Sequence, residues 1–327
     1  MPALTIWRNQ QFPPAVEARL RAGLSAIPGQ HRLSDAPTLA ADNLTPAPAD
    51  PACRAANVAF GQPHIDDVLA ADGPRFVQLS TAGYTRYDTA AVREAFAKRN
   101  ALLANASGVY AAPCAQHVLG YMLAEARQLP QALHQSRSEQ WQPAGHRARS
   151  RLLDGQSVLI LGYGAIAREL VRLLGPFKMS ITGVRRQARG DEGIEIIPPD
   201  AVDARLGGFD HVVNILPASP ETKNFFDAGR LSKLSPPAVF YNIGRGDTVD
   251  QDALVEALKA DKLAAAYLDV AAPEPLPAGH PLWKAPRCFI TPHTAGGMAD
   301  EWERLVDHFL ANLARFADGE PLQDRLF

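Results

Sequence analysis

Short apolar runs alternate with segments of helical periodicity along most of the chain. In the first third, the candidate strands are residues 3–7, 57–61, 75–80 and 101–106. From the middle of the chain onwards, the apolar or β-rich runs are residues 158–162, 178–184, 211–217, 238–244, 264–270 and 288–293. Strands that alternate with helical segments are typical of parallel sheets covered by helices on both faces. The pattern therefore predicts an α/β protein.

Three longer segments have a helical pattern. Residues 89–100 place Val92 and Phe96 on one face, and residues 113–129 begin with a proline, which suits a first helical turn. Residues 299–320 carry a wide apolar stripe, so we expect this helix to dock on another element.

Two segments lack periodicity. The Pro- and Ala-rich residues 42–55 predict a surface loop. The polar, basic residues 136–155 predict a connection, in which Arg147, Arg149 and Arg151 form a solvated loop in preference to an anion site.

Length and composition narrow the class of protein. A chain of 327 residues exceeds what one compact core usually serves, so two domains are expected. With 46% hydrophobic and 21% charged residues, the composition is that of an ordinary globular protein. The formal net charge is only -2 and the basic residues are scattered. This distribution argues against nucleic acid or an anionic membrane as a partner.

Cysteine usage and the N-terminus bear on location. The three cysteines, Cys53, Cys114 and Cys288, lie far apart and offer neither a disulfide framework nor a metal-binding spacing. No metal site is expected. The N-terminal residues lack the features of a signal peptide, and no apolar run approaches membrane-spanning length. We therefore expect a cytoplasmic protein.

A Gly-rich turn follows the apolar run at 158–161. Gly162, Gly164 and Ala167 fit the pattern GxGxxG/A, and Gly175 with Pro176 ends the helical segment that follows. In this pattern the first glycine makes a tight turn, the second admits a pyrophosphate and the small third residue allows close helix packing. Because strand, turn, helix and second strand occur in order, the segment predicts a dinucleotide-binding unit.

The end of the second strand indicates which dinucleotide. An acidic residue commonly stands there and accepts a hydrogen bond from the ribose 2′-hydroxyl, whereas this chain has Arg185 and Arg186. An arginine cannot accept that bond, but it can clamp a phosphate bidentately. We therefore expect NADP(H) to be preferred, with NAD(H) possible. The alternative is that both arginines are simply solvated at a strand end.

Four ordered motifs follow this turn: NILPASPETK, NIGRGDTVDQDAL, LDVAAPEPLP and TPHTAG. With these motifs the chain resembles the D-isomer-specific 2-hydroxyacid dehydrogenase family, and within it the NADPH-linked glyoxylate/hydroxypyruvate reductase type. The resemblance runs from about residue 81 to residue 296. It implies two lobes: a Rossmann-type dinucleotide-binding domain, residues 110–293, and a discontinuous flavodoxin-like substrate-binding domain, residues 1–109 and 294–327. It also implies a homodimer.

The resemblance assigns roles to individual residues. It places the catalytic Arg at Arg245, the Glu at Glu274 and the proton-donating His at His293. The backbone N–H groups of Ala82 and Gly83, with Arg245 and His293, would bind the substrate. The residues that would contact the cofactor are Tyr163, Gly164, Ala165, Ile166, Arg185, Arg186, Leu216, Pro217, Thr222, Ile243, Gly244, Asp269, His293 and Gly296, with Asp269 on the nicotinamide carboxamide.

The chemistry of 2-keto acid reduction suits these residue types. The carbonyl oxygen needs a proton, which an imidazole can supply near neutral pH, and a neighbouring carboxylate orients that imidazole. A guanidinium can hold the substrate carboxylate in a fork and stabilise negative charge on the carbonyl oxygen. Gly244 and Gly246, on either side of Arg245, are interpreted as leaving room for a ligand near the backbone.

The sequence is compatible with more than one substrate and with an alternative function. The substrate is glyoxylate-like, hydroxypyruvate-like or a bulkier 2-keto acid such as phenylpyruvate. An NAD(P)-sensing regulatory protein on the same fold is the alternative function. His117 is interpreted as a packed or interface residue, and Trp141 and Trp283 as structural residues.

Overall fold

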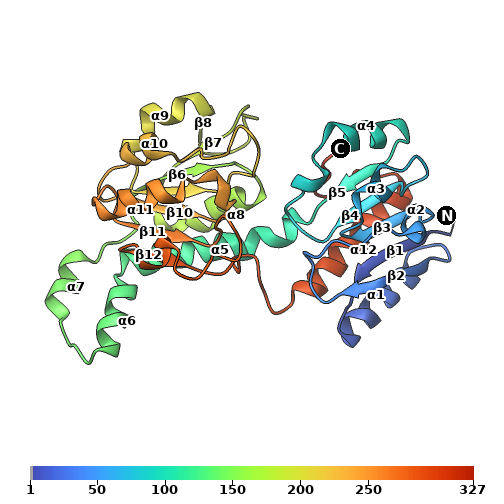
Figure 1. Cartoon of the computed structure of the whole chain (residues 1–327), viewed down its shortest axis with the longest axis horizontal. Coiled ribbons are helices and arrows are strands. Elements are labelled where there is room, and N and C mark those ends of the chain that lie inside the picture. The colour runs from blue at the N-terminus through green and yellow to red at the C-terminus, as the bar shows by residue number, and fades with distance from the viewer. Residues whose placement is uncertain (1–2) are drawn as a thin grey trace. The chain divides into compact units, whose positions relative to one another are not determined.

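The computed structural model describes residues 3–327 of the chain (Figure 1). The chain forms two compact units, each with its own parallel sheet. Unit 1 comprises the residues up to Tyr110 together with Met298–Phe327, and unit 2 comprises Ala111–Gly297. The boundaries expected from the sequence, 109/110 and 293/294, fall close to these division points. The α/β class with two domains is confirmed.

Unit 1 contains a five-stranded parallel sheet in the order β2-β1-β3-β4-β5. This order is that of flavodoxin-like sheets. The strands are β1 (Thr5–Gln10), β2 (Arg32–Ala40), β3 (Val58–Gly61), β4 (Phe76–Leu79) and β5 (Leu102–Ala104). The apolar runs predict all of them except β2. Every residue of that edge strand except Ala36 is exposed or half-buried, and the strand contains Asp35 and Pro37, so it has no apolar run.

The helices of unit 1 cover this sheet. They are α1 (Pro14–Ala26), α2 (Pro51–Arg54), α3 (Ile65–Leu69), α4 (Ala90–Lys98) and α12 (Glu301–Asp318). The predicted docking of the terminal helix is confirmed: Phe309 of α12 is fully buried and stacks on Phe60 of β3, with ring centroids 4.2 Å apart. The prediction of a surface loop at 42–55 is wrong in part. Cys53 in α2 is buried, and Asp50 caps that helix by accepting a hydrogen bond from the backbone N–H of Ala52.

Unit 2 contains a seven-stranded parallel sheet in the order β12-β11-β10-β9-β6-β7-β8. The strands are β6 (Ser157–Leu161), β7 (Ser180–Val184), β8 (Glu195–Ile197), β9 (His211–Asn214), β10 (Val239–Asn242), β11 (Ala265–Leu268) and β12 (Cys288–Ile290). The order reverses at β6, as in Rossmann-type sheets. Six of these strands lie where the apolar runs predict them. The short edge strand β8 is half-exposed and is not predicted.

The helices of unit 2 include two departures from prediction. They are α5 (Ser107–Ala126), α6 (Leu129–Arg137), α7 (Pro143–Arg149), α8 (Ala165–Leu174), α9 (Val202–Arg205), α10 (Ala228–Ser232) and α11 (Gln251–Lys259), with α5 starting in unit 1. Pro113 lies inside α5 rather than in its first turn, because the helix already begins at Ser107. The expected connection at 136–155 contains α7, and Figure 1 shows α6 and α7 standing away from the sheet of unit 2.

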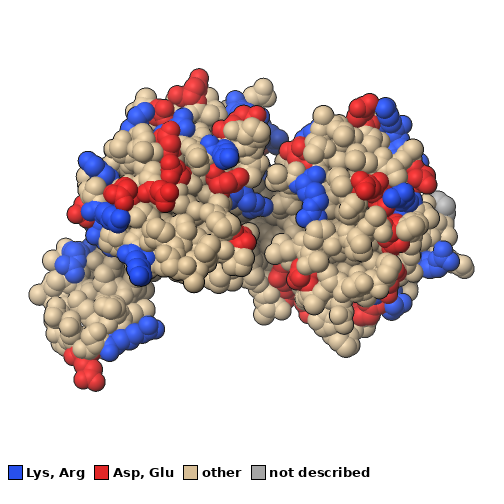
Figure 2. Space-filling view, viewed as in Figure 1, with Lys and Arg blue, Asp and Glu red and all other residues tan. Residues whose placement is uncertain are grey.

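The surface carries interspersed charges of both signs on the face seen in Figure 2. Among residues 3–327 no helix is long and apolar enough to cross a bilayer. The structural role expected of Trp141 is not borne out by packing, since its side chain is 92% exposed in the segment between α6 and α7. Trp283 is half exposed, and its indole N–H donates a hydrogen bond to the carbonyl oxygen of Pro277.

Candidate active site

The candidate residues of unit 2 share one edge of the sheet. The Gly-rich turn follows β6, Arg185 follows β7, Leu216 comes after β9, Arg245 follows β10, Glu274 comes after β11, and His293 follows β12. All these strands are parallel, so their carboxyl ends lie at the same edge. Ligands of open α/β sheets bind outside this edge.

The first glycine of the turn is required by the backbone. Gly162 has φ 91°, and a Cβ there would lie 2.7 Å from the carbonyl oxygen of Ile215. The third small residue, Ala167, lies in the first turn of α8 and is fully buried. Both observations agree with the roles expected for the first and third positions of the motif.

The second glycine faces open space. A Cβ on Gly164 would meet no atom within 4 Å. Gly164 is also the N-cap of α8, and no side chain within residues 3–327 caps that end of the helix. The first N–H groups of α8 are therefore available to an anion, and the glycine lets that anion come close. A dinucleotide pyrophosphate fits this part of the site.

The glycines beside Arg245 have another role than the one expected. A Cβ on Gly244 would lie 2.6 Å from the carbonyl oxygen of Leu216, and one on Gly246 would lie 2.0 Å from the carbonyl carbon of Ala271. The interpretation that they leave room for a ligand is wrong, because neighbouring backbone fills that space. Because Gly246 has no side chain, the loop of Arg245 can lie directly against the loop of Glu274.

Three buried polar side chains, which the sequence analysis missed, hold the Arg245 loop. The amide of Asn242 donates to the carbonyl oxygen of Arg245, and the hydroxyl of Thr248 donates to the same oxygen at 2.6 Å. The amide of Asn214 donates to both Asn242 and Thr248. All three are almost completely buried. A signal was present, because an Asn ends two neighbouring apolar strands.

Only part of the hydrogen-bonding capacity of the Arg245 guanidinium is used. Its Nη1 donates to the carbonyl oxygen of Gly244 at 2.6 Å. Within residues 3–327, no carboxylate forms an ion pair with Arg245. The remaining N–H groups can therefore bind an anion such as a carboxylate.

His293 and Glu274 lie in contact. The Nδ1–H of His293 donates to Oε2 of Glu274 at 2.7 Å, and the other carboxylate oxygen accepts from the backbone N–H of Ala271 at 3.0 Å. Both side chains are partly exposed, at 43% and 39%. Because Nδ1 is used by the carboxylate, Nε2 is the atom that can exchange a proton with a ligand. This pair can therefore act as an oriented acid or base.

Asp269 anchors the loop that carries His293. Its carboxylate accepts hydrogen bonds from the backbone N–H groups of Thr294 and Ala295, at 2.8 and 2.9 Å, and from the hydroxyl of Thr291 at 2.7 Å. The backbone N–H of His293 donates to the carbonyl oxygen of Asp269. His293 has φ 53°, in the left-handed region that side chains with a Cβ seldom adopt. Asp269 thus fixes the loop on both sides of a strained residue.

Burial shifts the pKa values of two groups behind this loop. Burial lowers the pKa of His117, against the opposing effect of Asp269, and its Nε2 lies 3.3 Å from the hydroxyl oxygen of Thr291. Burial also raises the pKa of the Cys114 thiol to about 12. His117 packs edge-on against Tyr121, as expected for a packed residue. Through its contact with Thr291, His117 supports the loop that carries His293.

The two arginines after β7 differ in their surroundings. Arg185 is half-buried, and its Nη1 lies 3.3 Å from Oε1 of Glu192. Arg186 is exposed. The pKa of Glu221 is lowered mainly by a hydrogen bond with Ser219, and the charge of Arg186 makes a smaller contribution. The turn and Arg185 are neighbours, because the backbone N–H of Tyr163 donates to the carbonyl oxygen of Val184. A cation therefore stands beside the Gly-rich turn.

The other expected cofactor residues lie along the same edge. Thr222 closes its turn by donating from its hydroxyl to the carbonyl oxygen of Pro217 at 2.6 Å. Leu216 is held by a hydrogen bond from its N–H to Asn214, and Ile243 is buried. Ala165 and Ile166 begin α8, and Gly296 ends the His293 loop.

Ala82 and Gly83 follow β4 in unit 1. Their carbonyl oxygens accept hydrogen bonds from the side chains of Asn105 and Thr81, at 2.7 Å each. Their own N–H groups have no hydrogen-bond acceptor within residues 3–327. A pair of fixed, unpaired N–H groups can bind a carboxylate.

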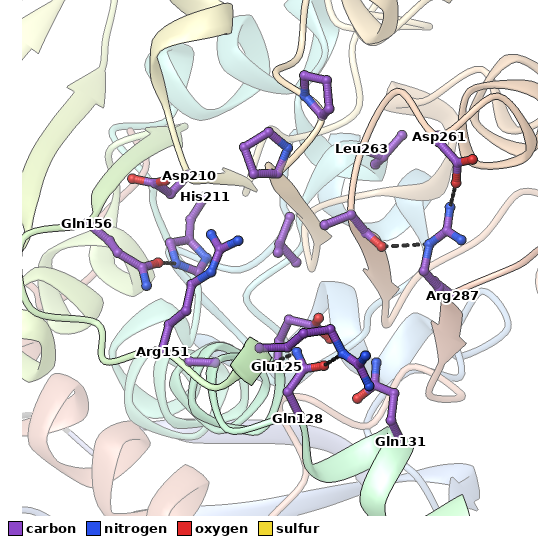
Figure 3. A pocket seen from close by; sticks show the side chains of 16 residues that line it. Glu125, Gln128, Gln131, Arg151, Gln156, Asp210, His211, Asp261, Leu263 and Arg287 are labelled. Carbon is purple, nitrogen blue, oxygen red and sulfur yellow. Dashed lines mark hydrogen bonds and ion pairs between the residues drawn. The ribbon is translucent and has the colours of Figure 1, made fainter. Parts of the chain in front are cut away.

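A hollow of about 550 Å³ lies at the opposite edge of the unit 2 sheet (Figure 3). It is lined by residues that precede the strands, among them Gln156, Asp210 and Arg287. Arg149 and Arg151 also line it, and with Arg287 they are matched in number by three carboxylates: Glu125, Asp210 and Asp261. The hollow therefore has no net positive charge that would select an anion.

The profile described as "D-isomer specific 2-hydroxyacid dehydrogenase, NAD binding domain" matches residues 119–295. This match covers more than half of the chain and includes β6–β12 with every candidate site residue of unit 2 except Gly296.

The chain is also similar to individual proteins. It is 32% identical over 273 residues to the human glyoxylate reductase/hydroxypyruvate reductase, covering 80% of this chain and 81% of the human protein. A solved D-isomer specific 2-hydroxyacid dehydrogenase family protein from Aeromonas salmonicida is 28% identical, with a TM-score of 0.77 and 99% of each chain covered. An NADPH-dependent glyoxylate/hydroxypyruvate reductase from Sinorhizobium meliloti, solved with NADP and sulfate, is 22% identical and shares the fold, with a TM-score of 0.76 over 99% of this chain and 98% of the other.

Proposed function

The chain belongs to the D-isomer specific 2-hydroxyacid dehydrogenase family, and from this premise we propose that it reduces a small 2-keto acid to the D-2-hydroxy acid with NADPH. The substrates we expect are of the glyoxylate and hydroxypyruvate kind, the reaction named for the human relative. The observation that carries the proposal is the hydrogen bond between His293 and Glu274 at the carboxyl edge of a Rossmann-type sheet.

The cofactor part of the proposal rests on the turn and on Arg185. The open space at Gly164 and the uncapped start of α8 suit a pyrophosphate, and Arg185 suits the 2′-phosphate of NADP(H). The solved S. meliloti protein of the same fold holds NADP. When bound, the nicotinamide supplies the hydride. Binding of NAD(H) remains part of the proposal, since the profile is described as NAD binding.

His293 is proposed to deliver the proton. Its Nε2 has no partner within residues 3–327, whereas its Nδ1 donates to Glu274. Glu274 orients the imidazole and balances the positive charge of its protonated form. As hydride reaches the carbonyl carbon, Nε2–H of His293 donates its proton to the carbonyl oxygen, which becomes the hydroxyl of the product.

Arg245 is proposed to bind the substrate carboxylate. Its carbonyl oxygen is fixed by Asn242 and Thr248, so the position of its backbone is set before substrate arrives. Its free N–H groups would hold the carboxylate and stabilise charge that develops on the carbonyl oxygen. In unit 1, the unpaired N–H groups of Ala82 and Gly83 would also bind a substrate carboxylate. We propose that Asp269 also contacts the nicotinamide carboxamide, in addition to the three hydrogen bonds that it accepts from the loop.

One assay tests the proposal. The decrease in absorbance of NADPH or NADH at 340 nm is followed with glyoxylate, hydroxypyruvate, pyruvate and phenylpyruvate, and the products are analysed on a chiral column. We expect the largest kcat/KM for glyoxylate or hydroxypyruvate with NADPH, and a D product where the product is chiral. Phenylpyruvate as the best substrate would contradict the small-substrate part. No turnover with retained cofactor binding would favour a dinucleotide-sensing regulator.

The homodimer is part of the same proposal. Helices α6 and α7 contain no buried residue, and the segment around them exposes the apolar side chains of Leu129, Leu133, Trp141 and Leu152. Exposed apolar surface of this kind favours association. Light scattering after size-exclusion chromatography should give twice the chain mass of 35.3 kDa. The cytoplasmic location also stays a proposal, consistent with three unpaired cysteines.

A further inference from the structure

The residue of interest is Glu192, a carboxylate that nothing in the proposed reaction uses. It lies in the loop between β7 and β8, and its side chain is only 4% exposed. Oε1 accepts a hydrogen bond from the backbone N–H of Arg189 at 2.7 Å, and Oε2 accepts one from that of Gly190 at 2.8 Å. A buried carboxylate held in this way is a fixed part of the loop.

Its charge is fixed as well. The backbone N–H of Arg189 is the main cause that lowers the pKa of Glu192, with smaller contributions from other N–H groups and from Arg185. The loop is tied to the Gly-rich turn, because the hydroxyl of Tyr163 donates to the carbonyl oxygen of Glu192 at 3.2 Å. A permanent negative charge therefore stands next to the turn.

Arg185 is the cation nearest to the Glu192 carboxylate, and it is also the residue expected to bind the cofactor. Nη1 of Arg185 lies 3.3 Å from Oε1 of Glu192, a longer contact than the two backbone bonds of that carboxylate. Arg185 thus makes a single long contact with Glu192, whereas two backbone hydrogen bonds hold Glu192 in its loop. A 2′-phosphate bound to Arg185 would lie near a carboxylate that cannot move away, and two anions that share one guanidinium repel each other.

We propose that Glu192 is a specificity-determining residue that limits the preference for a 2′-phosphorylated dinucleotide. It lowers the affinity for NADP(H) by repelling the 2′-phosphate and leaves NAD(H), which has a hydroxyl there, usable. This inference rests on the proposed role of Arg185 in cofactor selection. Arg185 would attract the 2′-phosphate and Glu192 would repel it. The preference between NADP(H) and NAD(H) would then depend on the balance of these two side chains.

The test measures binding of two cofactor fragments, 2′,5′-ADP and 5′-AMP, by isothermal titration calorimetry. The discrimination ratio is Kd for 5′-AMP divided by Kd for 2′,5′-ADP. In Glu192→Gln we expect this ratio to rise by about tenfold, because the neutral amide no longer repels the 2′-phosphate. The amide keeps the shape of the side chain, and any loosening of the loop affects both fragments, so the ratio isolates the charge.

Two further variants serve as controls. Glu195→Gln removes a nearby carboxylate that is half exposed and paired with Arg205, and it should change the ratio less than twofold. Adding Arg185→Ser to Glu192→Gln should abolish the gain, because the gain depends on the guanidinium. The rise in Glu192→Gln should also diminish at high salt.

The outcomes separate the inference from the cofactor proposal. A wild-type ratio of one or less would contradict the NADP(H) preference, whatever the variant does. The inference depends only on the change in the ratio: a rise supports it with any wild-type value. An unchanged ratio in Glu192→Gln overturns it, and a fall would mean that Glu192 instead orients Arg185 for the phosphate.

Discussion

Nδ1 of His293 lies 2.7 Å from Oε2 of Glu274, although the two residues come from loops after different strands, β12 and β11. Neither loop alone would fix this distance. The Glu274 loop is held by hydrogen bonds in both directions between Gln251 and the backbone of Ala272. The His293 loop is held by Asp269. The pair is thus positioned by the sheet edge and by two independent anchors.

Removal of the imidazole should abolish most turnover. In His293→Ala we expect kcat to fall by about 10²–10⁴-fold, the usual contribution of a positioned general acid, with 2′,5′-ADP binding unchanged. Glu274→Gln, whose amide oxygen can still accept the Nδ1–H, should lose about tenfold. Steady-state kinetics with glyoxylate checks both, and His134→Ala on exposed α6 is the control. Full activity in His293→Ala would exclude it from proton transfer.

Replacing the guanidinium should weaken substrate binding and turnover together. In Arg245→Lys the charge remains but the forked contact with a carboxylate is lost. Since a hydrogen bond to a charged group contributes about 1.5–3 kcal/mol, kcat/KM should fall roughly 10–150-fold. Arg304→Lys, at an exposed ion pair on α12, should leave kcat/KM unchanged. An unaltered KM and kcat in Arg245→Lys would remove Arg245 from the site.

Two glycines should respond in opposite ways. Gly246→Ala places a Cβ 2.0 Å from the backbone of Ala271, so it should lower the free energy of unfolding by about 1–3 kcal/mol and reduce kcat. Gly164→Ser meets no atom within 4 Å and supplies a side-chain cap for α8, so stability should be retained while NADPH affinity falls. Urea unfolding and calorimetric titration of each variant test this. Tight NADPH binding by Gly164→Ser would contradict the pyrophosphate position.

Neutralising Asp269 should affect the fold and the reaction together. In Asp269→Asn the amide nitrogen cannot accept a hydrogen bond, so a backbone N–H of Thr294 or Ala295 loses its partner. A buried unsatisfied donor costs about 1–3 kcal/mol, and kcat should fall because the loop of His293 loosens. Asp227→Asn, at the N-cap of α10, should reduce stability without lowering kcat. Equal effects of the two variants on kcat would argue against the anchor.

His211 should make stability depend on pH. Burial lowers its pKa to about 4 from the model-compound 6.5, so the unfolded chain binds this proton at a higher pH than the folded one. The folded state therefore loses stability as pH falls from about 6.5 towards 4, by up to about 3 kcal/mol. His211→Gln should show a smaller loss between pH 7 and pH 5 in urea unfolding. The exposed His134→Gln should behave as wild type, and identical slopes for all three would refute the prediction.

The sequence predicts those parts of the molecule that rest on local pattern. The central strands are buried on both faces and appear as apolar runs, and the motif residues lie in fixed order behind them. Edge strands β2 and β8 are half-exposed and carry charged residues. They therefore lack the run of apolar residues by which a buried strand is recognised. Pro113 lies inside α5, a position that is uncommon for proline, so the sequence does not reveal that the helix begins at Ser107.

The rest depends on contacts between segments far apart in the chain. Nothing near Gly246 in the sequence reveals that Ala271 fills the space beside it. The ring of hydrogen bonds around Asp269 joins three residues beyond position 290, and Glu192 becomes noticeable only once its loop folds back on Arg185. Sequence reasoning identified the residue types that reactions need, but not the side chains that hold them in place.

Division of the chain into two units has a practical consequence for protein engineering. Every expected cofactor residue and the three expected catalytic side chains belong to residues 111–297, whereas Ala82 and Gly83 belong to the other unit. Libraries aimed at the choice between NADP(H) and NAD(H) can start from the loops after β6 and β7, which carry the proposed determinants Arg185 and Glu192. Libraries that alter substrate scope can start from the loop after β4, where mutations leave the interlocked backbone of Gly246 and Ala271 untouched.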